Sequence, residues 1–94
     1  MSAKLVYRFD YIAPKAEVAV FFHGLSDGFT SFSLRVFPGF GTGVSHPVGH
    51  VTLRQEEFYR HVDGTMARKL YVHNLAPLNS CAVDVLLFEV PAVH

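Results

Sequence analysis

The sequence predicts an all-β fold, an antiparallel β-sandwich of the jelly-roll or immunoglobulin-like type with about seven short strands. Apolar and polar residues alternate with period two along most of the chain, which is typical of half-buried strands. Turn-forming residues separate these segments at short, regular spacing. The 3.6-residue period of an amphipathic helix is hardly visible. A chain of 94 residues accommodates one domain, so residues 1–94 are predicted to form a single domain.

Three strands are predicted in the first part of the chain, at residues 5–12, 17–23 and 31–37. The third strand alternates most clearly, with Phe32, Leu34 and Val36 on one face and polar side chains on the other. Residues 24–28 form a predicted turn between the second and third strands, because Asp27-Gly28 is a common hairpin signal.

Residues 38–49 form a predicted long loop. They include four of the seven glycines and two of the five prolines, a density at which a strand ladder is expected to end. Phe40 is the aromatic residue of this segment and is a candidate anchor for a partner. We expect this loop to be the most mobile or the most partner-dependent segment, because glycines raise the entropy that is lost when it becomes ordered.

The second half of the chain contains four further predicted strands, at residues 50–55, 58–62, 68–75 and 82–90. Glu56-Glu57 is predicted to form a bend between the first two of them. Asp63-Gly64 is predicted to close a hairpin, and residues 76–80 interrupt the chain before the last strand. Adjacent residues of an extended segment point to opposite faces, so the two glutamates are not expected to act together in acid–base chemistry.

Charge and cysteine content argue against several partners and compartments. Eight basic and eight acidic residues give a net charge of zero, so we expect no binding to nucleic acid or to a membrane. No apolar run approaches the roughly 20 residues of a membrane span, and the N-terminus does not resemble a signal peptide. The single cysteine, Cys81, favours a reducing compartment and hence a cytoplasmic location, with export that needs no cleaved signal as the alternative.

The excess of apolar residues predicts a second buried surface. Half of the chain is hydrophobic and only 17% is charged, whereas a small domain has little interior to fill. We therefore predict a non-catalytic structural or binding module that forms homo-oligomers. Asp84 marks one face of the last predicted strand as the outward one, although large apolar residues share it. The candidate interface residues are Leu86, Phe88 and Val90 on that face, and Phe40 in the loop.

Six histidines raise an alternative, a small His-coordinated metal-binding protein or metalloenzyme of the β-barrel type. Alternating spacing places His61 and Asp63 on one face of a predicted strand. The candidate polar or ligand site consists of His23, Arg60, His61, Asp63, Tyr71 and His73. The chain lacks a His-X-His pair followed by a glutamate, so no stoichiometric transition metal and no cofactor are predicted.

Two other roles compete for the same polar residues. His61 and Asp63 could form a cross-strand ion pair with Arg68 or Lys69, or they could belong to a polar network between subunits. The network between subunits is the functional role that the sequence favours, because it agrees with the predicted homo-oligomer.

No catalytic residue is predicted. Cys81 would act as a nucleophile only beside an activating group such as His73, and a buried, inert thiol is the expected state.

A third functional hypothesis is a carbohydrate-binding module, because the predicted fold is small, neutral and rich in aromatic residues. Tyr59 and Tyr71 are candidate platforms for a sugar ring, and packing between strands is the competing interpretation.

Overall fold

The computed structural model describes residues 3–41 and 49–90, apart from the side chain of Phe40. These residues contain six strands rather than about seven, and no helix. The strands are β1 (Ala3–Ile12), β2 (Glu17–Leu25), β3 (Phe29–Gly41), β4 (Val51–Arg60), β5 (Met66–Asn74) and β6 (Asn79–Val90). In the described part of the chain, no helix has the length and apolar character needed to span a membrane.

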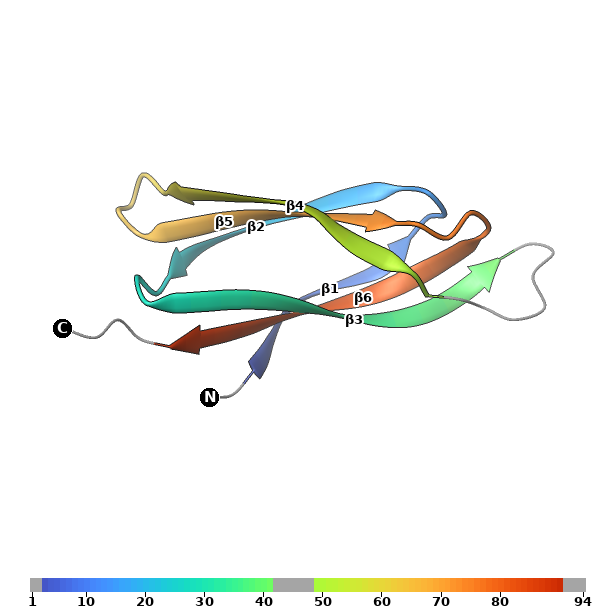
Figure 1. The fold of residues 1–94 in the computed structure, drawn as a ribbon, viewed down its shortest axis with the longest axis horizontal. Coiled ribbons are helices and arrows are strands. Elements are labelled where there is room, and N and C mark those ends of the chain that lie inside the picture. Colours follow the sequence, from blue (N-terminus) through green and yellow to red (C-terminus); the bar gives the residue numbers. More distant parts are fainter. Residues whose placement is uncertain (1–2, 42–48, 91–94) are drawn as a thin grey trace.

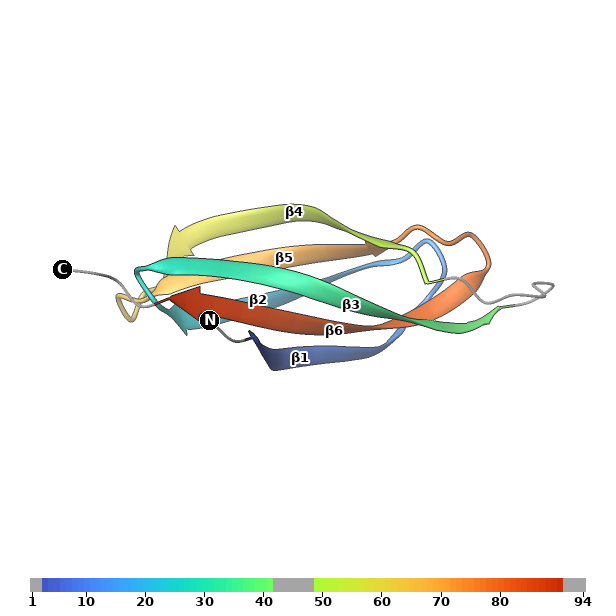
Figure 2. The same cartoon turned by 60° about the horizontal axis from the view of Figure 1, so that its bottom comes forward.

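The strands form two antiparallel three-stranded sheets, in the orders β1-β6-β3 and β2-β5-β4. Figures 1 and 2 show the two sheets as separate layers, one lying over the other. Each ladder contains β5 or β6, so these two strands are central and the other four are edge strands. Most consecutive strands lie in different sheets, whereas β4 and β5 are neighbours and pair as a hairpin.

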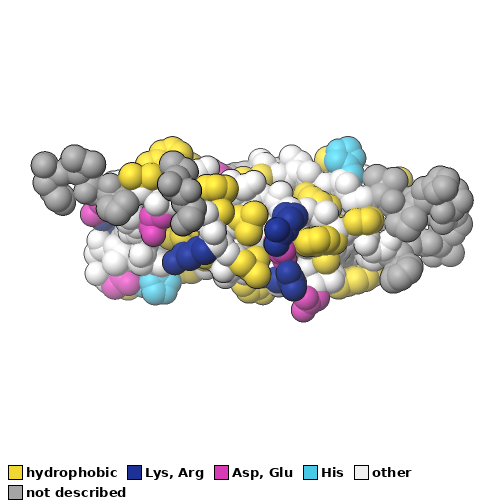
Figure 3. Space-filling view, turned by 90° about the horizontal axis from the view of Figure 1, so that it is seen from below, with side chains coloured by type: hydrophobic (Ala, Val, Ile, Leu, Met, Phe, Trp, Pro, Cys, Tyr) yellow, Lys and Arg dark blue, Asp and Glu magenta, His cyan; other side chains and the backbone are white. Residues whose placement is uncertain are grey.

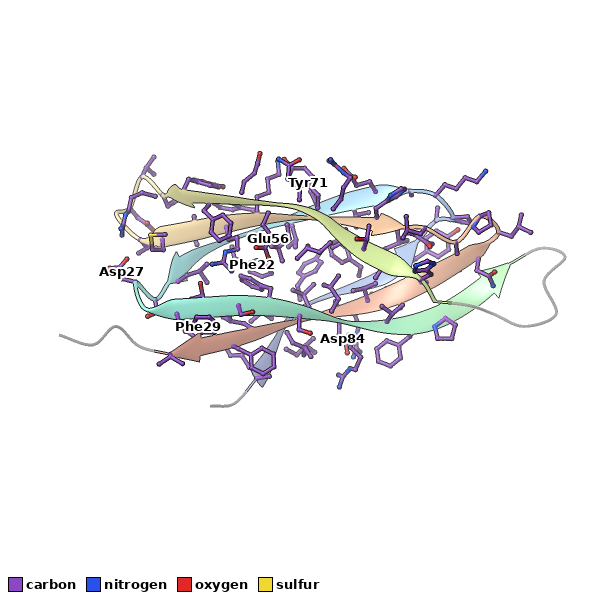
Figure 4. The ribbon with its side chains drawn as sticks, in the orientation of Figure 1. Phe22, Asp27, Phe29, Glu56, Tyr71 and Asp84 are labelled. Atoms are coloured by element: carbon purple, nitrogen blue, oxygen red, sulfur yellow. The ribbon has the colours of Figure 1, made fainter. Side chains whose placement is uncertain are left out.

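Alternate side chains of both sheets fill the space between the layers, as the period-two pattern predicts. They form two apolar clusters, and each cluster contains residues of both sheets. Phe22 of β2 packs against one of them and lies between the sheets in Figure 4. The residues of the central strands that are at most 4% exposed in these clusters are Leu70, Val72, Cys81, Val83, Val85 and Leu87.

β4 is one continuous strand where two strands and a bend were predicted. Glu57 pairs with Lys69 within the ladder, so Glu56-Glu57 is not a bend. Two adjacent acidic residues fit in mid-strand because their side chains point to opposite faces. The irregularity of this strand lies earlier, at a register shift between Leu53 and Gln55.

β3 continues through Pro38 and Gly39, where a loop was predicted. Pro38 pairs with Cys81, and β3 is an edge strand, where a missing N–H is tolerated. A Cβ atom at Gly39 would lie 2.4 Å from the Oγ atom of Ser80, so glycine here permits a close approach of two strands. Residues 42–48 of the predicted loop lie outside the described residues, so its mobility stays a prediction.

Candidate functional site

The outer face of the β1-β6-β3 sheet carries large apolar side chains. Leu86, Phe88 and Val90, the predicted interface residues of β6, are all partly exposed on this face. Their neighbours on the edge strands are more exposed: Leu5 is 49% exposed and Phe29 is 57% exposed. We call this surface the outer apolar face, and its residues are Leu5, Phe29, Phe37, Leu86, Phe88 and Val90. The side chain of Phe40 lies outside the described residues, so its role at an interface stays a prediction.

A charged cluster lies in the middle of the outer apolar face. Arg8 of β1 and Arg35 of β3 flank Asp84 of β6 in register. The Nε atom of Arg8 donates to Oδ1 of Asp84 over 2.5 Å, and Nη2 of Arg35 donates to Oδ2 over 2.7 Å. Both arginine side chains are about half exposed, and the Asp84 side chain beneath them is fully covered. Figure 3 shows the cluster with apolar side chains on both sides of it.

The hydrogen bonds from Arg8 and then Arg35 lower the pKa of Asp84 to about 2, so the carboxylate is charged at neutral pH. Asp10 adds a second negative charge that acts on Arg8. Two arginines and two aspartates give this group no net charge, so it does not oppose the burial of the face by repulsion between like charges. The sequence placed Asp84 on the outward face but did not reveal its two arginine partners.

On the other sheet, His23, His61 and Asp63 lie together where β2 ends and β4 turns into β5. Nδ1 of His23 lies 3.2 Å from Oδ2 of Asp63, and Nδ1 of His61 lies 3.1 Å from Oδ1. The two imidazole rings stack with their centroids 4.4 Å apart and their planes at 12°. One potential ligand atom of each residue lies within 4.8 Å of the others. We call these three residues the histidine–aspartate cluster.

A tight turn places His61 and Asp63 side by side. β4 ends at Arg60, so His61 lies in the turn and not within a strand as predicted. The His61 carbonyl accepts a hydrogen bond from the Gly64 N–H over 2.9 Å, and the His61 N–H donates to the Thr65 carbonyl over 2.8 Å. Gly64 has a φ of +88°. This is the pattern of a three-residue hairpin loop that a left-handed glycine closes.

A β-bulge at the end of β2 brings His23 to this turn. Two residues of β2, His23 and Gly24, oppose only Ala67 of β5. Gly24 has a φ of +76°, a conformation that glycine adopts without strain. Bulges bend a strand and redirect its side chains. The bulge therefore explains how His23 reaches a turn that belongs to two other strands.

Thr65 fixes the orientation of the Asp63 carboxylate. Its backbone N–H and its hydroxyl donate to Oδ1 of Asp63 over 2.9 and 2.6 Å. The same hydroxyl accepts a hydrogen bond from the Gly24 N–H over 2.8 Å, which ties the bulge to the turn. The hydrogen bonds from Thr65, and less strongly those from His61, hold the pKa of Asp63 well below its usual value. Sequence reasoning missed Thr65, although it follows a turn-forming Asp-Gly pair at the position where it can bond the aspartate.

Aromatic residues support the cluster from within the sheet. The rings of Phe21 and Tyr59 stack with centroids 5.5 Å apart. The ring of Phe21 also lies 5.8 Å from that of His23 and 5.7 Å from that of His61. Ala67, the register partner of Tyr59 on the central strand, is only 1% exposed. Its small side chain leaves room for the two larger rings to meet over β5.

The other residues of the predicted polar site lie outside the cluster. Arg60 donates to Oδ1 of Asp27 over 2.9 Å, at the edge of the same turn. Nε2 of His73 lies 3.0 Å from the Lys15 carbonyl oxygen, near the opposite end of β5. The structure thus joins two of the predicted histidines with Asp63 and leaves His73, Arg60 and Tyr71 in other contacts.

Arg68 does not form the predicted ion pair with the turn. It is 8% exposed, and its guanidinium donates to the Thr30 hydroxyl over 2.7 Å. The rings of Phe32 and Phe58 lie 5.2 and 4.4 Å from it. Since Arg68 bonds to β3 of the other sheet, it cannot pair with His61 and Asp63. That part of the ion-pair hypothesis is wrong, because alternation directs Arg68 into the space between the sheets.

Tyr59 and Tyr71, the candidate sugar platforms, both take part in packing between strands. Tyr59 stacks on Phe21 as described above. The ring of Tyr71 lies 5.4 Å from the Arg54 guanidinium and 5.1 Å from the Lys69 ammonium. Its hydroxyl donates to Oε1 of Glu57 over 3.1 Å. Figure 4 shows Tyr71 on the outer side of the β2-β5-β4 sheet.

Comparison of the chain with models of protein families, with curated proteins and with solved structures finds no match. A function for the outer apolar face and for the histidine–aspartate cluster must therefore be inferred from their geometry. They lie on different sheets, so each can be tested without disturbing the other.

Proposed function

We propose that this chain is a non-catalytic structural or binding module that forms homo-oligomers through its outer apolar face. The observation that carries the proposal is the exposure of Leu5, Phe29 and Phe37 around the partly exposed Leu86 and Phe88. Large apolar patches that are grouped on one face of a protein usually mark a contact with another molecule.

The thin shape of the molecule supports the proposal. Its principal extents are 55 × 26 × 16 Å, so two layers of strands enclose a single layer of core side chains. In the described residues, ten hydrophobic residues are buried and eleven large hydrophobic residues are exposed. The interior therefore uses only part of the apolar supply, and a second buried surface would use more of it.

We also propose that the fold is a jelly-roll β-sandwich, because the strand orders favour it over the immunoglobulin-like alternative. β1 pairs with β6 and β2 pairs with β5, while consecutive strands mostly change sheet. A long antiparallel hairpin that wraps around a core produces this arrangement. The single domain over residues 1–94 and the cytoplasmic location stay predictions beside it.

In the proposed contact, the outer apolar faces of two copies pack against each other around a twofold axis. Full burial of one Leu or Phe side chain contributes roughly 1.5–3 kcal/mol, and a symmetric contact uses each residue twice. The neutral cluster of Asp84 and its arginines lies inside this surface. Its half-exposed guanidinium groups would set the register between the subunits, and the apolar residues would supply the affinity.

The native mass in solution tests this proposal. We expect wild type to run as an oligomer by light scattering at tens of micromolar. Leu86→Glu should dissociate it while β-sheet circular dichroism is retained, because two charges would face each other in the contact. The matched control is Leu78→Glu, at a 52% exposed leucine outside the face, which should leave the mass unchanged.

Leu5→Glu provides a second test if Leu86→Glu does not fold, because Leu5 is the exposed register partner of Leu86 on β1. A monomeric wild type at tens of micromolar would overturn the proposal. An oligomer that persists in a folded Leu5→Glu or Leu86→Glu variant would show that another surface forms the contact.

A further inference from the structure

We propose that the histidine–aspartate cluster binds a divalent transition metal ion, and that zinc fits it best. This site is separate from the proposed self-association, since it lies on the opposite sheet. Two imidazole nitrogens and one carboxylate oxygen are a ligand set found in zinc sites that keep one open position. The proposal replaces the expectation of no stoichiometric metal, which rested on the missing His-X-His motif.

One distance between ligand atoms already fits a tetrahedral ion, and the three ligand atoms lie within 4.8 Å of one another. Zinc bonds of about 2.0–2.1 Å place neighbouring ligand atoms roughly 3.3 Å apart. The two distances from imidazole nitrogen to carboxylate oxygen are 3.2 Å at His23 and 3.1 Å at His61. The first distance ends on Oδ2 of Asp63 and the second on Oδ1. With Oδ2 as the carboxylate ligand, the edge from His23 to Asp63 is therefore close to its final length before any metal binds.

The other edges require a rotation of the stacked rings. A metal lies near the plane of each imidazole that binds it, whereas the two ring planes are now at only 12°. The side chain of His23 is 51% exposed and can turn into solvent, while that of His61 is 27% exposed and more confined. Binding should therefore open the stack mainly by a rotation of His23.

The surrounding hydrogen bonds fix the orientation of Asp63, the third ligand. Thr65 bonds to Oδ1 of Asp63 through its N–H and its hydroxyl, and Gly24 bonds to that hydroxyl. Partners of this kind orient a ligand and raise metal affinity. The carboxylate oxygen Oδ2, which faces His23, makes no hydrogen bond to Thr65 and is directed at the site.

The environment leaves one side of the cluster open. The ring of Phe21 packs beside both histidines, and the side chain of Asp63 is 41% exposed. A water molecule or a small ligand can therefore complete the coordination of a bound ion from the solvent. The competing explanation is that the three side chains form only a hydrogen-bonded ion pair.

Titration of the full chain with zinc chloride in a calorimeter at neutral pH separates the two explanations. We expect one zinc ion per chain at this site. His23→Gln and His61→Gln should each lower the affinity at least about tenfold, because each removes one of three ligands. The matched control is His73→Gln, since His73 contacts the Lys15 carbonyl and lies outside the cluster. This control should bind zinc like wild type.

Imidazole NMR signals give a second readout that needs no variant to fold. Zinc should shift the ring signals of His23 and His61 and leave those of His73 in place. The proposal is overturned if wild type binds no zinc, if His23→Gln and His61→Gln bind it as wild type does, or if His73→Gln alone loses binding. Leu86→Glu should keep one zinc ion per chain, so failure of the self-association proposal is distinguishable from failure of this one.

Discussion

Arg35 and Asp84 lie opposite each other on β3 and β6, and the arginine Nη2 donates to the carboxylate Oδ2 over 2.7 Å. Arg8 binds the same carboxylate from β1, on the other side. One aspartate on the central strand therefore joins both edge strands of its sheet by side-chain hydrogen bonds. These bonds act in addition to the backbone ladders, and they depend on the negative charge of the carboxylate.

Asp84→Asn should lower the melting temperature by several degrees. The substitution keeps the shape of the side chain but removes the charge that both arginines bind, and it leaves two positive charges close together. Asp27→Asn is the matched control, because Asp27 is 63% exposed and its surface ion pair with Arg60 contributes little to stability. Equal melting temperatures for both variants would contradict the assigned role of Asp84.

The stability of wild type should fall as the pH decreases from about 4 to about 2. The pKa of Asp84 is about 2 in the folded protein and roughly 3.9 in an unfolded chain. A lowered pKa gives stability that is present above the unfolded value and is lost as the pH falls through the folded value. Asp63 and Glu17 also have lowered pKa values and act in the same direction.

Urea unfolding at several pH values, with wild type and Asp84→Asn side by side, checks this expectation. The difference in unfolding free energy between the two proteins should be largest near neutral pH and should shrink toward pH 2. A difference that stays constant over this range would show that the charge of Asp84 is not the cause.

Ala67→Leu should reduce the free energy of unfolding by roughly 1–3 kcal/mol, the usual range for overpacking. Ala67 is 1% exposed and lies on β5 between the strands that carry Phe21 and Tyr59, so a larger side chain would separate the two rings. Ala19→Leu on the same sheet face is the control, because Ala19 is exposed. Urea unfolding should show a loss only for the first variant.

Gly24→Ala should cost roughly 1–2 kcal/mol of stability, because φ is +76° at this position and an alanine is strained there. Apart from its chain neighbours, no residue in the described part of the chain has an atom within 4 Å of the added Cβ, so the cost comes from the backbone and not from a clash. Gly24→Asn should cost less, since asparagine enters the left-handed region more readily. Equal losses for the two variants in thermal unfolding would count against backbone strain at the bulge.

Local alternation was sufficient to predict most of the strands. Asp84 was predicted to lie on the outward face of β6, so alternation puts Val83, Val85 and Leu87 on the opposite face, and these residues are in the core. It did not identify Arg8 and Arg35 as partners of Asp84, because that requires the order of the strands in the sheet. The same limit applied at Gly39. Its local composition predicted a loop, whereas the glycine allows β3 to lie close to Ser80 of β6.

The histidine–aspartate cluster shows a different limit. His23, His61 and Asp63 were all candidate site residues, but alternation along a strand was the wrong reason to group His61 with Asp63. A turn places these two together, and a bulge adds His23. Both devices interrupt regular strands, so a period-two pattern cannot reveal them.

The central positions of β5 and β6 also determine when this chain can fold during its synthesis. β1, β2, β3 and β4 form no ladder with one another, since each pairs with β5 or β6. A ribosome makes all four of them before either central strand is available. Until then their backbone N–H and C=O groups have no native ladder partner, which is the condition in which strands aggregate. Both sheets must therefore assemble late, around strands that arrive last, and a chaperone that shields the earlier strands should raise the yield of folded protein.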